Sequence, residues 1–192
     1  MKITAAEQTQ ARELAFLINL AGEGIPEYLW SALAEAGESP LDVGARRAAR
    51  EEGGFSYHNA RVCLDDSGEL MGMVIAYRQP DPYDLDALSE YPDIVRPLVQ
   101  LEAEAPGSWY INAIATDARF RGQGVATALM KDTEGSAREA GCRQMSLIVA
   151  SQNRGARRLY EQLGYRGTHA RPVVPYPGSP HGGDWVLMLK PL

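Results

Sequence analysis

The chain has 192 residues, a formal net charge of −6 and 45% hydrophobic side chains, which is the profile of a folded globular protein. A length of about 100–200 residues is typical of one domain, so a single domain over residues 1–192 is expected. The apolar runs are too short to span a bilayer. The two cysteines, Cys63 and Cys142, are too few for a disulfide framework or a cysteine-rich zinc site. The N-terminus lacks the apolar stretch of a secretory signal, so a cytoplasmic location without membrane attachment is expected.

Charge is distributed unevenly along the chain. Residues 1–107 carry 8 basic and 19 acidic side chains, whereas residues 108–192 carry 11 basic and 6 acidic ones. The asymmetry suggests that the basic half meets an anion and the acidic half a cation, although two solvated faces would give the same pattern. The acidic excess, and the lack of a basic stripe interleaved with aromatic residues, argue against nucleic-acid binding.

The first part of the chain predicts three helices and a hairpin. In the first helix, Leu14, Leu17 and Ile18 have helical spacing, and Phe16 and Leu20 are expected to widen this apolar stripe. Turn-forming residues separate the later elements. Helices are expected over 9–20, 26–35 and 42–52, and hairpin strands over 57–64 and 69–77, joined by a turn at 65–68.

The second part of the chain predicts alternating strands and helices. An acidic, proline-rich insertion over 79–107, which holds seven acidic residues and one basic residue, precedes it and contains a short helix near 93–102. The alternation predicts an α/β (α+β) fold with a central sheet. Strands are expected over 109–115, 144–150 and 184–189, helices over 125–140 and 153–163, and a loop rich in proline and glycine over 171–183.

A glycine-rich loop lies between the strand at 109–115 and the helix that follows it. It reads Arg121-Gly122-Gln123-Gly124-Val125-Ala126. Such a loop leaves backbone N–H groups unpaired at a helix N-terminus, where the helix dipole favours an anion. The Walker A and dinucleotide-binding motifs do not fit these residues. Taken alone, the loop is equally well explained as a plain turn.

A second motif lies downstream, and the two together resemble those of the GNAT superfamily of acetyl-CoA-dependent N-acetyltransferases. The family's cofactor motif is matched by Arg121, Gly124 and Ala126. Its later motif is matched by Asn153, Ala156, Leu159, Tyr160, Gly164 and Tyr165. The resemblance is firmest over the cofactor-binding core, residues 108–166. It implies a mixed, mostly antiparallel central sheet, splayed at its middle, with helices on both faces.

The resemblance also implies the roles of individual residues. Acetyl-CoA would be held by backbone groups of the loop and of the preceding strand, and by the Asn153 side chain, which is equally suited to cap a helix. Tyr160 would be the general acid that protonates the departing thiolate, although its spacing also suits a core tyrosine. The implied cofactor residues are Ile114, Ala115, Arg121, Gly122, Gln123, Gly124, Val125, Ala126 and Asn153.

The acceptor and the general base are left open by the sequence. The acceptor would be a small cationic amine or a peptide amine, attacked directly in a ternary complex, and its lining residues are expected to be Glu23, Tyr28, Trp30, Tyr83 and Tyr176. The base could be Glu23, Glu102 or Glu104, or a water held by Tyr110 or Asn112. A non-catalytic acyl-CoA-binding or sensing module is the alternative to an enzyme. No metal site is expected, because the histidines are scattered, and a homodimer is possible by analogy.

Overall fold

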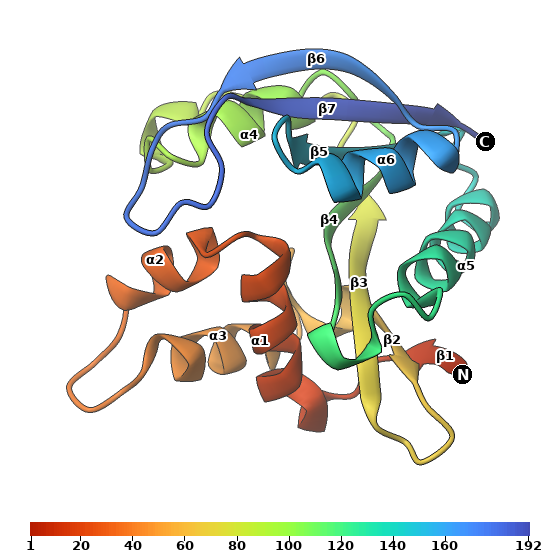
Figure 1. Ribbon diagram of the computed structural model, residues 1–192. Coiled ribbons are helices and arrows are strands. Elements are labelled where there is room, and N and C mark those ends of the chain that lie inside the picture. Colours follow the sequence, from red (N-terminus) through yellow and green to blue (C-terminus); the bar gives the residue numbers. More distant parts are fainter. The chain divides into compact units, whose positions relative to one another are not determined.

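A computed structural model describes all residues, 1–192, and they form two compact units. Unit 1 comprises residues 1–76 and 112–133, and unit 2 comprises residues 77–111 and 134–192. The single-domain organisation expected from the chain length stays a prediction. Six helices are present (Figure 1): α1 (Ala11–Ala21), α2 (Ile25–Ser31), α3 (Pro40–Ala48), α4 (Arg96–Glu102), α5 (Val125–Glu139) and α6 (Arg154–Gln162).

Seven strands are hydrogen-bonded in the order β1-β2-β3-β4-β5-β7-β6, which leaves the sheet open. In unit 1, β1 pairs antiparallel with β2, and β2 pairs antiparallel with β3. In unit 2, β4 pairs parallel with β5, and β7 pairs antiparallel with both β5 and β6. The expected mixed α/β fold with a mostly antiparallel sheet is confirmed, whereas the splayed centre stays a prediction. The strands are β1 (Lys2–Ala5), β2 (Ala60–Leu64), β3 (Leu70–Arg78), β4 (Trp109–Thr116), β5 (Gln144–Ala150), β6 (Arg166–Pro172) and β7 (Asp184–Pro191).

Helices α1, α2 and α3 pack together within unit 1 (Figure 1). Leu14, Leu17 and Ile18 of α1 are buried as the spacing predicts. Phe16 and Leu20 are 51% and 37% exposed, so the prediction that they widen the buried stripe is wrong. At 100° per residue, these two side chains lie on the side of the helix opposite Leu14.

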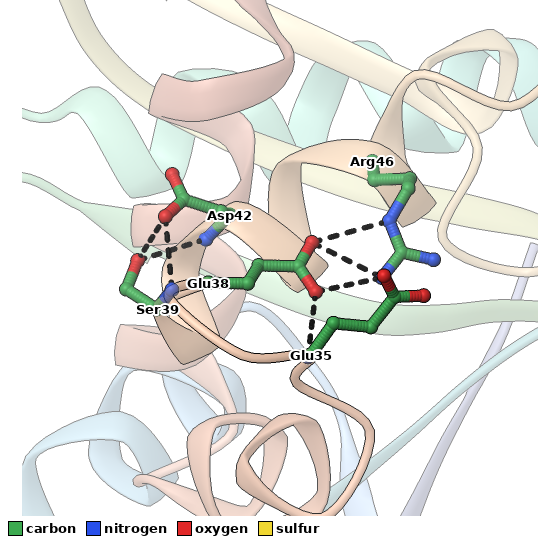
Figure 2. A network of polar contacts seen from close by, with 5 residues as sticks. All are labelled: Glu35, Glu38, Ser39, Asp42 and Arg46. Carbon is green, nitrogen blue, oxygen red and sulfur yellow. Dashed lines mark hydrogen bonds and ion pairs between the residues drawn. The ribbon is translucent and has the colours of Figure 1, made fainter.

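The boundaries of α2 and α3 differ from those expected. α2 ends at Ser31 rather than at residue 35, and α3 covers 40–48 rather than 42–52. The earlier start of α3 has a local cause, because Ser39 and Asp42 form a capping box (Figure 2). Pro40 occupies the first helical position. The Ser39 hydroxyl donates to the Asp42 carboxylate at 2.5 Å, and Asp42 N donates back to the Ser39 oxygen at 3.2 Å.

Strands β1 and β6 have no counterpart among the elements expected from the sequence pattern. Strand β1 has only four residues. Strand β6, with sequence RGTHARP, has six exposed positions and one partly buried one, so no alternation of buried and exposed residues marks it. Edge strands of this kind carry little hydrophobic signal. By contrast, β5 agrees with the prediction at both ends, because Met145, Leu147 and Val149 make it strongly apolar.

The base of the acidic insertion is closed by the backbone within unit 2. Gln79 N donates to Ser108 O at 2.8 Å, and Gly107 N donates to Pro80 O at 3.1 Å. Helix α4 of the insertion packs against β6 and β7, where it buries Val99 and Leu101. The insertion is therefore an ordered part of unit 2 that places α4 directly before β4. None of the six helices combines the length and apolar character that a membrane crossing requires.

Candidate active site

The glycine-rich loop of unit 1 leads directly into α5. Residues 121–124 are exposed, and Gly122 and Gly124 have positive φ values of 75° and 81°. A Cβ atom added to either glycine would meet nothing within 4 Å. The Ala128 N–H donates to Gly124 O at 3.0 Å, and no acceptor pairs with the N–H groups of residues 125–127. Unpaired N–H groups beside open space at a helix N-terminus fit a phosphate group, which supports the cofactor role expected of this loop.

A charged brace orders the start of this loop. Arg119 donates to both carboxylate oxygens of Asp117, and its guanidinium also pairs with Glu69. These contacts raise the pKa of Arg119, and the bond from Arg119 lowers the pKa of Asp117. Arg121 is exposed and lies close enough to Asp117 to help lower the pKa of that carboxylate, but the contacts from Arg119 dominate. The brace was not expected, because Glu69 lies 50 residues before Arg119 and no local pattern connects them.

Gly72 of β3 allows the end of β4 to approach closely. A Cβ atom at Gly72 would lie 2.6 Å from Ala115 O and 3.0 Å from Val125 Cγ1. Asp117 N donates to Met71 O at 2.9 Å, so the chain is also held two residues after Ala115. This packing fixes the backbone of the expected cofactor residues Ile114 and Ala115, and also the first residue of α5.

The expected cofactor and acid residues of unit 2 both lie at α6. Asn153 caps the helix, since its side-chain oxygen accepts a hydrogen bond from Ala156 N at 3.2 Å. Tyr160 is the one buried residue of α6, with 8% of its surface exposed, and its ring centre lies 6.2 Å from that of Tyr165. Burial, followed by the nearby Glu134 carboxylate, raises the pKa of Tyr165. The cap role of Asn153 is therefore observed, and the cofactor and acid roles stay predictions.

Three of the residues expected to line the acceptor site lie in unit 1. Glu23 has a left-handed backbone, with φ 55°, in the turn between α1 and α2. Tyr28 is 43% exposed on α2, whereas Trp30 is only 5% exposed. The Trp30 ring packs on Gly44 of α3, where a Cβ atom would lie 2.4 Å from the ring. Trp30 thus has a clear packing role, and Tyr28 has the accessibility that a binding role needs.

The other two residues expected to line the acceptor site lie in unit 2. Tyr176 is buried in the loop between β6 and β7, with 7% of its surface exposed. Tyr83, in the acidic insertion, is partly buried, and its hydroxyl donates to the Glu102 carboxylate at 2.7 Å. Tyr83, which is expected to line the acceptor site, therefore contacts Glu102, which is one of the possible general bases.

The residues considered as general base lie in different surroundings. Glu102 is partly buried, burial raises its pKa, and Tyr110 is one of its hydrogen-bond donors. Glu104 is exposed and forms an ion pair with Arg171 at 3.1 Å. Asn112 is a partly buried residue of β4 in unit 1. No group of three or more acidic, histidine or cysteine side chains has the arrangement of a metal site.

The loop and the fold indicate an acetyltransferase, and comparison with known proteins agrees with this class of enzyme. The model of the acetyltransferase (GNAT) family matches residues 25–165, so the chain belongs to this family. A search of curated proteins found no match.

Solved structures show the same fold at low sequence identity. The alignment with an acetyltransferase structure covers 100% of this chain and 99% of the acetyltransferase chain, with 20% identity and a TM-score of 0.68. An N-acetyltransferase from Staphylococcus aureus Mu50 covers 98% and 100%, with 17% identity and a TM-score of 0.68. A variant of an agmatine N-acetyltransferase in its apo form covers 100% and 99%, with 16% identity and a TM-score of 0.70.

Family membership confirms several expectations from the sequence. The chain is an acyltransferase, and its acetyl donor is acetyl-CoA, the cofactor of the family. The resemblance and the fold class are confirmed as well. The individual site residues, the possible homodimer, the absence of nucleic-acid binding and the cytoplasmic location stay predictions.

Proposed function

We propose that this acetyltransferase transfers the acetyl group to a primary amine, which attacks directly while both substrates are bound. The observation that carries the proposal is the row of unpaired N–H groups at the start of α5, beside two glycines with open space around them. This arrangement suits the phosphates of acetyl-CoA. The acidic residues of the insertion favour a cationic acceptor, because complementary charge promotes encounter.

The loop and the end of β4 would hold acetyl-CoA mainly through backbone groups. The N–H groups of Gly122 through Ala126 would bind the pyrophosphate, and Arg121 would add a charge-assisted contact. Since Asp117 N donates to Met71 O, alternation along β4 turns the backbone groups of Ala115 toward β3 and those of Ile114 away from it. Ile114 would therefore pair with the pantetheine arm, and the contacts of Ala115 with β3 would fix the position of Ile114.

Tyr160 would act as the general acid. Acetyl-CoA supplies a thioester whose carbon–sulfur bond breaks as the new carbon–nitrogen bond forms. The sulfur leaves with the proton of the Tyr160 hydroxyl. The attacking amine releases one proton to water, and a proton from water restores the Tyr160 phenol, so the overall transfer balances. A phenol with an ordinary pKa near 10 can protonate a thiolate whose conjugate thiol has a pKa near 8.5. A positioned acid of this kind contributes roughly 10²–10⁴-fold to the rate.

The proposal is tested by release of free thiol from acetyl-CoA with a panel of amines. The panel contains agmatine, 1,4-diaminobutane and a lysine-containing peptide, and each product is identified by mass spectrometry. We expect an N-acetylated product from at least one cationic amine. Tight binding of acetyl-CoA without turnover of any amine would instead support a non-catalytic acyl-CoA-binding module.

The Tyr160→Phe variant tests the acid. We expect kcat to fall by about 100-fold or more, with little change in the affinity for acetyl-CoA. Tyr165→Phe is the matched control, because Tyr165 is buried beside Tyr160 and its hydroxyl has no hydrogen-bond partner. Equal activity of the wild-type enzyme and the Tyr160→Phe variant would remove Tyr160 from the mechanism.

A further inference from the structure

The acidic insertion holds one carboxylate unlike the others. Glu102 lies at the end of α4, and its partners come from the residue that follows β3, from the insertion and from β4. The Tyr83 hydroxyl donates to its carboxylate at 2.7 Å, and Gln79 Nε2 does so at 3.4 Å. Tyr110 of β4 donates a third hydrogen bond. Residues from three separate segments of unit 2 thus converge on one carboxylate.

All these partners are uncharged. No lysine, arginine or histidine forms an ion pair with Glu102, whereas the neighbouring Glu104 pairs with Arg171. Burial accordingly raises the pKa of Glu102 despite its three hydrogen bonds. A carboxylate withdrawn from water is costly unless a cation compensates it. Glu102 is therefore surrounded by hydrogen-bond donors but has no cationic side chain as a partner.

Aromatic rings complete the surroundings of this carboxylate. Tyr77 of β3 lies edge-on to Tyr110, with ring centres 6.0 Å apart and planes at 77°. Tyr77, Tyr83 and Glu102 are each partly exposed, whereas Tyr110 is buried. Aromatic faces attract cations, and most strongly where water is partly excluded. Carboxylate and tyrosine rings together form the recognition chemistry of an alkylammonium group.

We propose that Glu102, together with Tyr77 and Tyr83, binds an aliphatic ammonium group of the acceptor amine. The inference deepens the proposed function. It depends on that function only in identifying the bound amine as the acetyl acceptor. Tyr110 and Gln79 hold the carboxylate in place from its buried side, and the ammonium group supplies the charge that the cluster lacks. A neutral acceptor of the same length would leave Glu102 uncompensated, so the site selects for charge. Glu102 acts here as a binding residue.

Direct binding tests this assignment without any need for turnover. The probes are 1,4-diaminobutane and its uncharged analogue 1,4-butanediol, added at millimolar concentrations to the full-length protein with and without coenzyme A. Isothermal titration calorimetry should detect the diamine and not the diol. For the Glu102→Gln variant, we expect the affinity for the diamine to fall at least about tenfold, because one partner of a desolvated charge pair is lost.

Matched variants separate this effect from general charge loss and from unfolding. Glu104→Gln removes the same charge two residues away on an exposed, ion-paired side chain, and it should leave the affinity unchanged. Tyr83→Phe keeps the carboxylate and removes one donor, so it should weaken binding less than Glu102→Gln does. Should Glu102→Gln fail to fold, Tyr83→Phe still tests the cluster. Undiminished affinity in Glu102→Gln, equal losses in the two glutamate variants, or no binding of the diamine to the wild-type protein would overturn the proposal.

Turnover provides a second and separate readout. With a cationic amine, Glu102→Gln should raise KM more than it lowers kcat, and KM for acetyl-CoA should not change. If the diamine binds through Glu102 and no amine is acetylated, the proposed function fails while the ammonium site stands. If amines are acetylated and Glu102→Gln changes neither KM nor diamine affinity, the site fails while the function stands.

Discussion

The glycine loop of unit 1 and the Glu102 cluster of unit 2 suit the ligands proposed for them in opposite ways. The loop is exposed and offers backbone N–H groups at one helix N-terminus, beside glycines with open space around them. The Glu102 cluster is partly buried and offers a carboxylate and aromatic rings from three segments. Backbone groups are the same in every protein, so the loop suits a cofactor shared by a whole family. Side chains can differ from protein to protein, so the cluster suits the acceptor.

This contrast predicts that side-chain changes in the loop, other than at Arg121, matter little unless they change the backbone. The strongest such change is Gly124→Val, because Gly124 has φ 81° and β-branched residues are genuine outliers there. The strain of about 2–3 kcal/mol should turn the N–H groups of α5 away from the phosphates. We expect KM for acetyl-CoA to rise roughly 30- to 100-fold, with a smaller change in kcat, in steady-state kinetics.

Gly135→Ala is the control for this change. Gly135 lies inside α5, its φ is not positive, and a Cβ atom there would meet nothing within 4 Å. Alanine should therefore stabilise the helix by roughly 0.5–1 kcal/mol without changing KM. Equal KM values for wild-type enzyme and Gly124→Val would contradict the backbone role of the loop.

The same contrast explains which parts could be predicted from the sequence. The loop can be predicted from the spacing of Arg121, Gly124 and Ala126. A positive φ and a helix start both restrict which residue types occur at adjacent positions. The Glu102 cluster has no such local sequence pattern. The sequence indicates Tyr83 and Glu102 as separate candidates, yet their contact depends on how the insertion folds. Gln79, which donates to the same carboxylate, carried no signal at all, since a strand-end glutamine is common on any surface.

The limits of prediction for the fold have a similar origin. β5 and α5 were predicted closely, because burial imposes a strong apolar period on them. The exposed edge strand β6 was missed, because it is held by backbone pairing with β7 rather than by buried side chains. The predicted ends of α2 and α3 differ from the observed ones, because helix ends depend on local contacts between a few atoms and not on the apolar spacing.

Gly44 is a glycine whose expected effect is on stability rather than on binding. A Cβ atom at Gly44 would lie 2.4 Å from the Trp30 ring, and Trp30 is almost fully buried. Gly44→Ala should therefore lower the free energy of unfolding by about 1–2 kcal/mol, measured by chemical denaturation, while KM for acetyl-CoA remains unchanged. Gly155→Ala, at an open helical position in α6, is the comparison. A stable Gly44→Ala variant with altered kinetics would mean that Trp30 serves the acceptor directly.

Asp42 provides the smallest effect and a second contrast with Glu102. Hydrogen bonds from Ser39 (Figure 2), followed by one from Arg12, lower the pKa of Asp42 to about 2. Burial, by contrast, raises the pKa of Glu102. Because the folded state prefers the ionised Asp42, its contribution is complete above the unfolded pKa of 3.8 and is lost as the pH falls toward 2. The difference in unfolding free energy between wild type and Asp42→Asn should therefore shrink below about pH 4. Ser39→Ala should cost about 1 kcal/mol at neutral pH, because it removes the cap of α3. A difference between wild type and Asp42→Asn that stays constant from neutral pH down to pH 2 would show that the capping box, although formed, does not depend on the charge of Asp42.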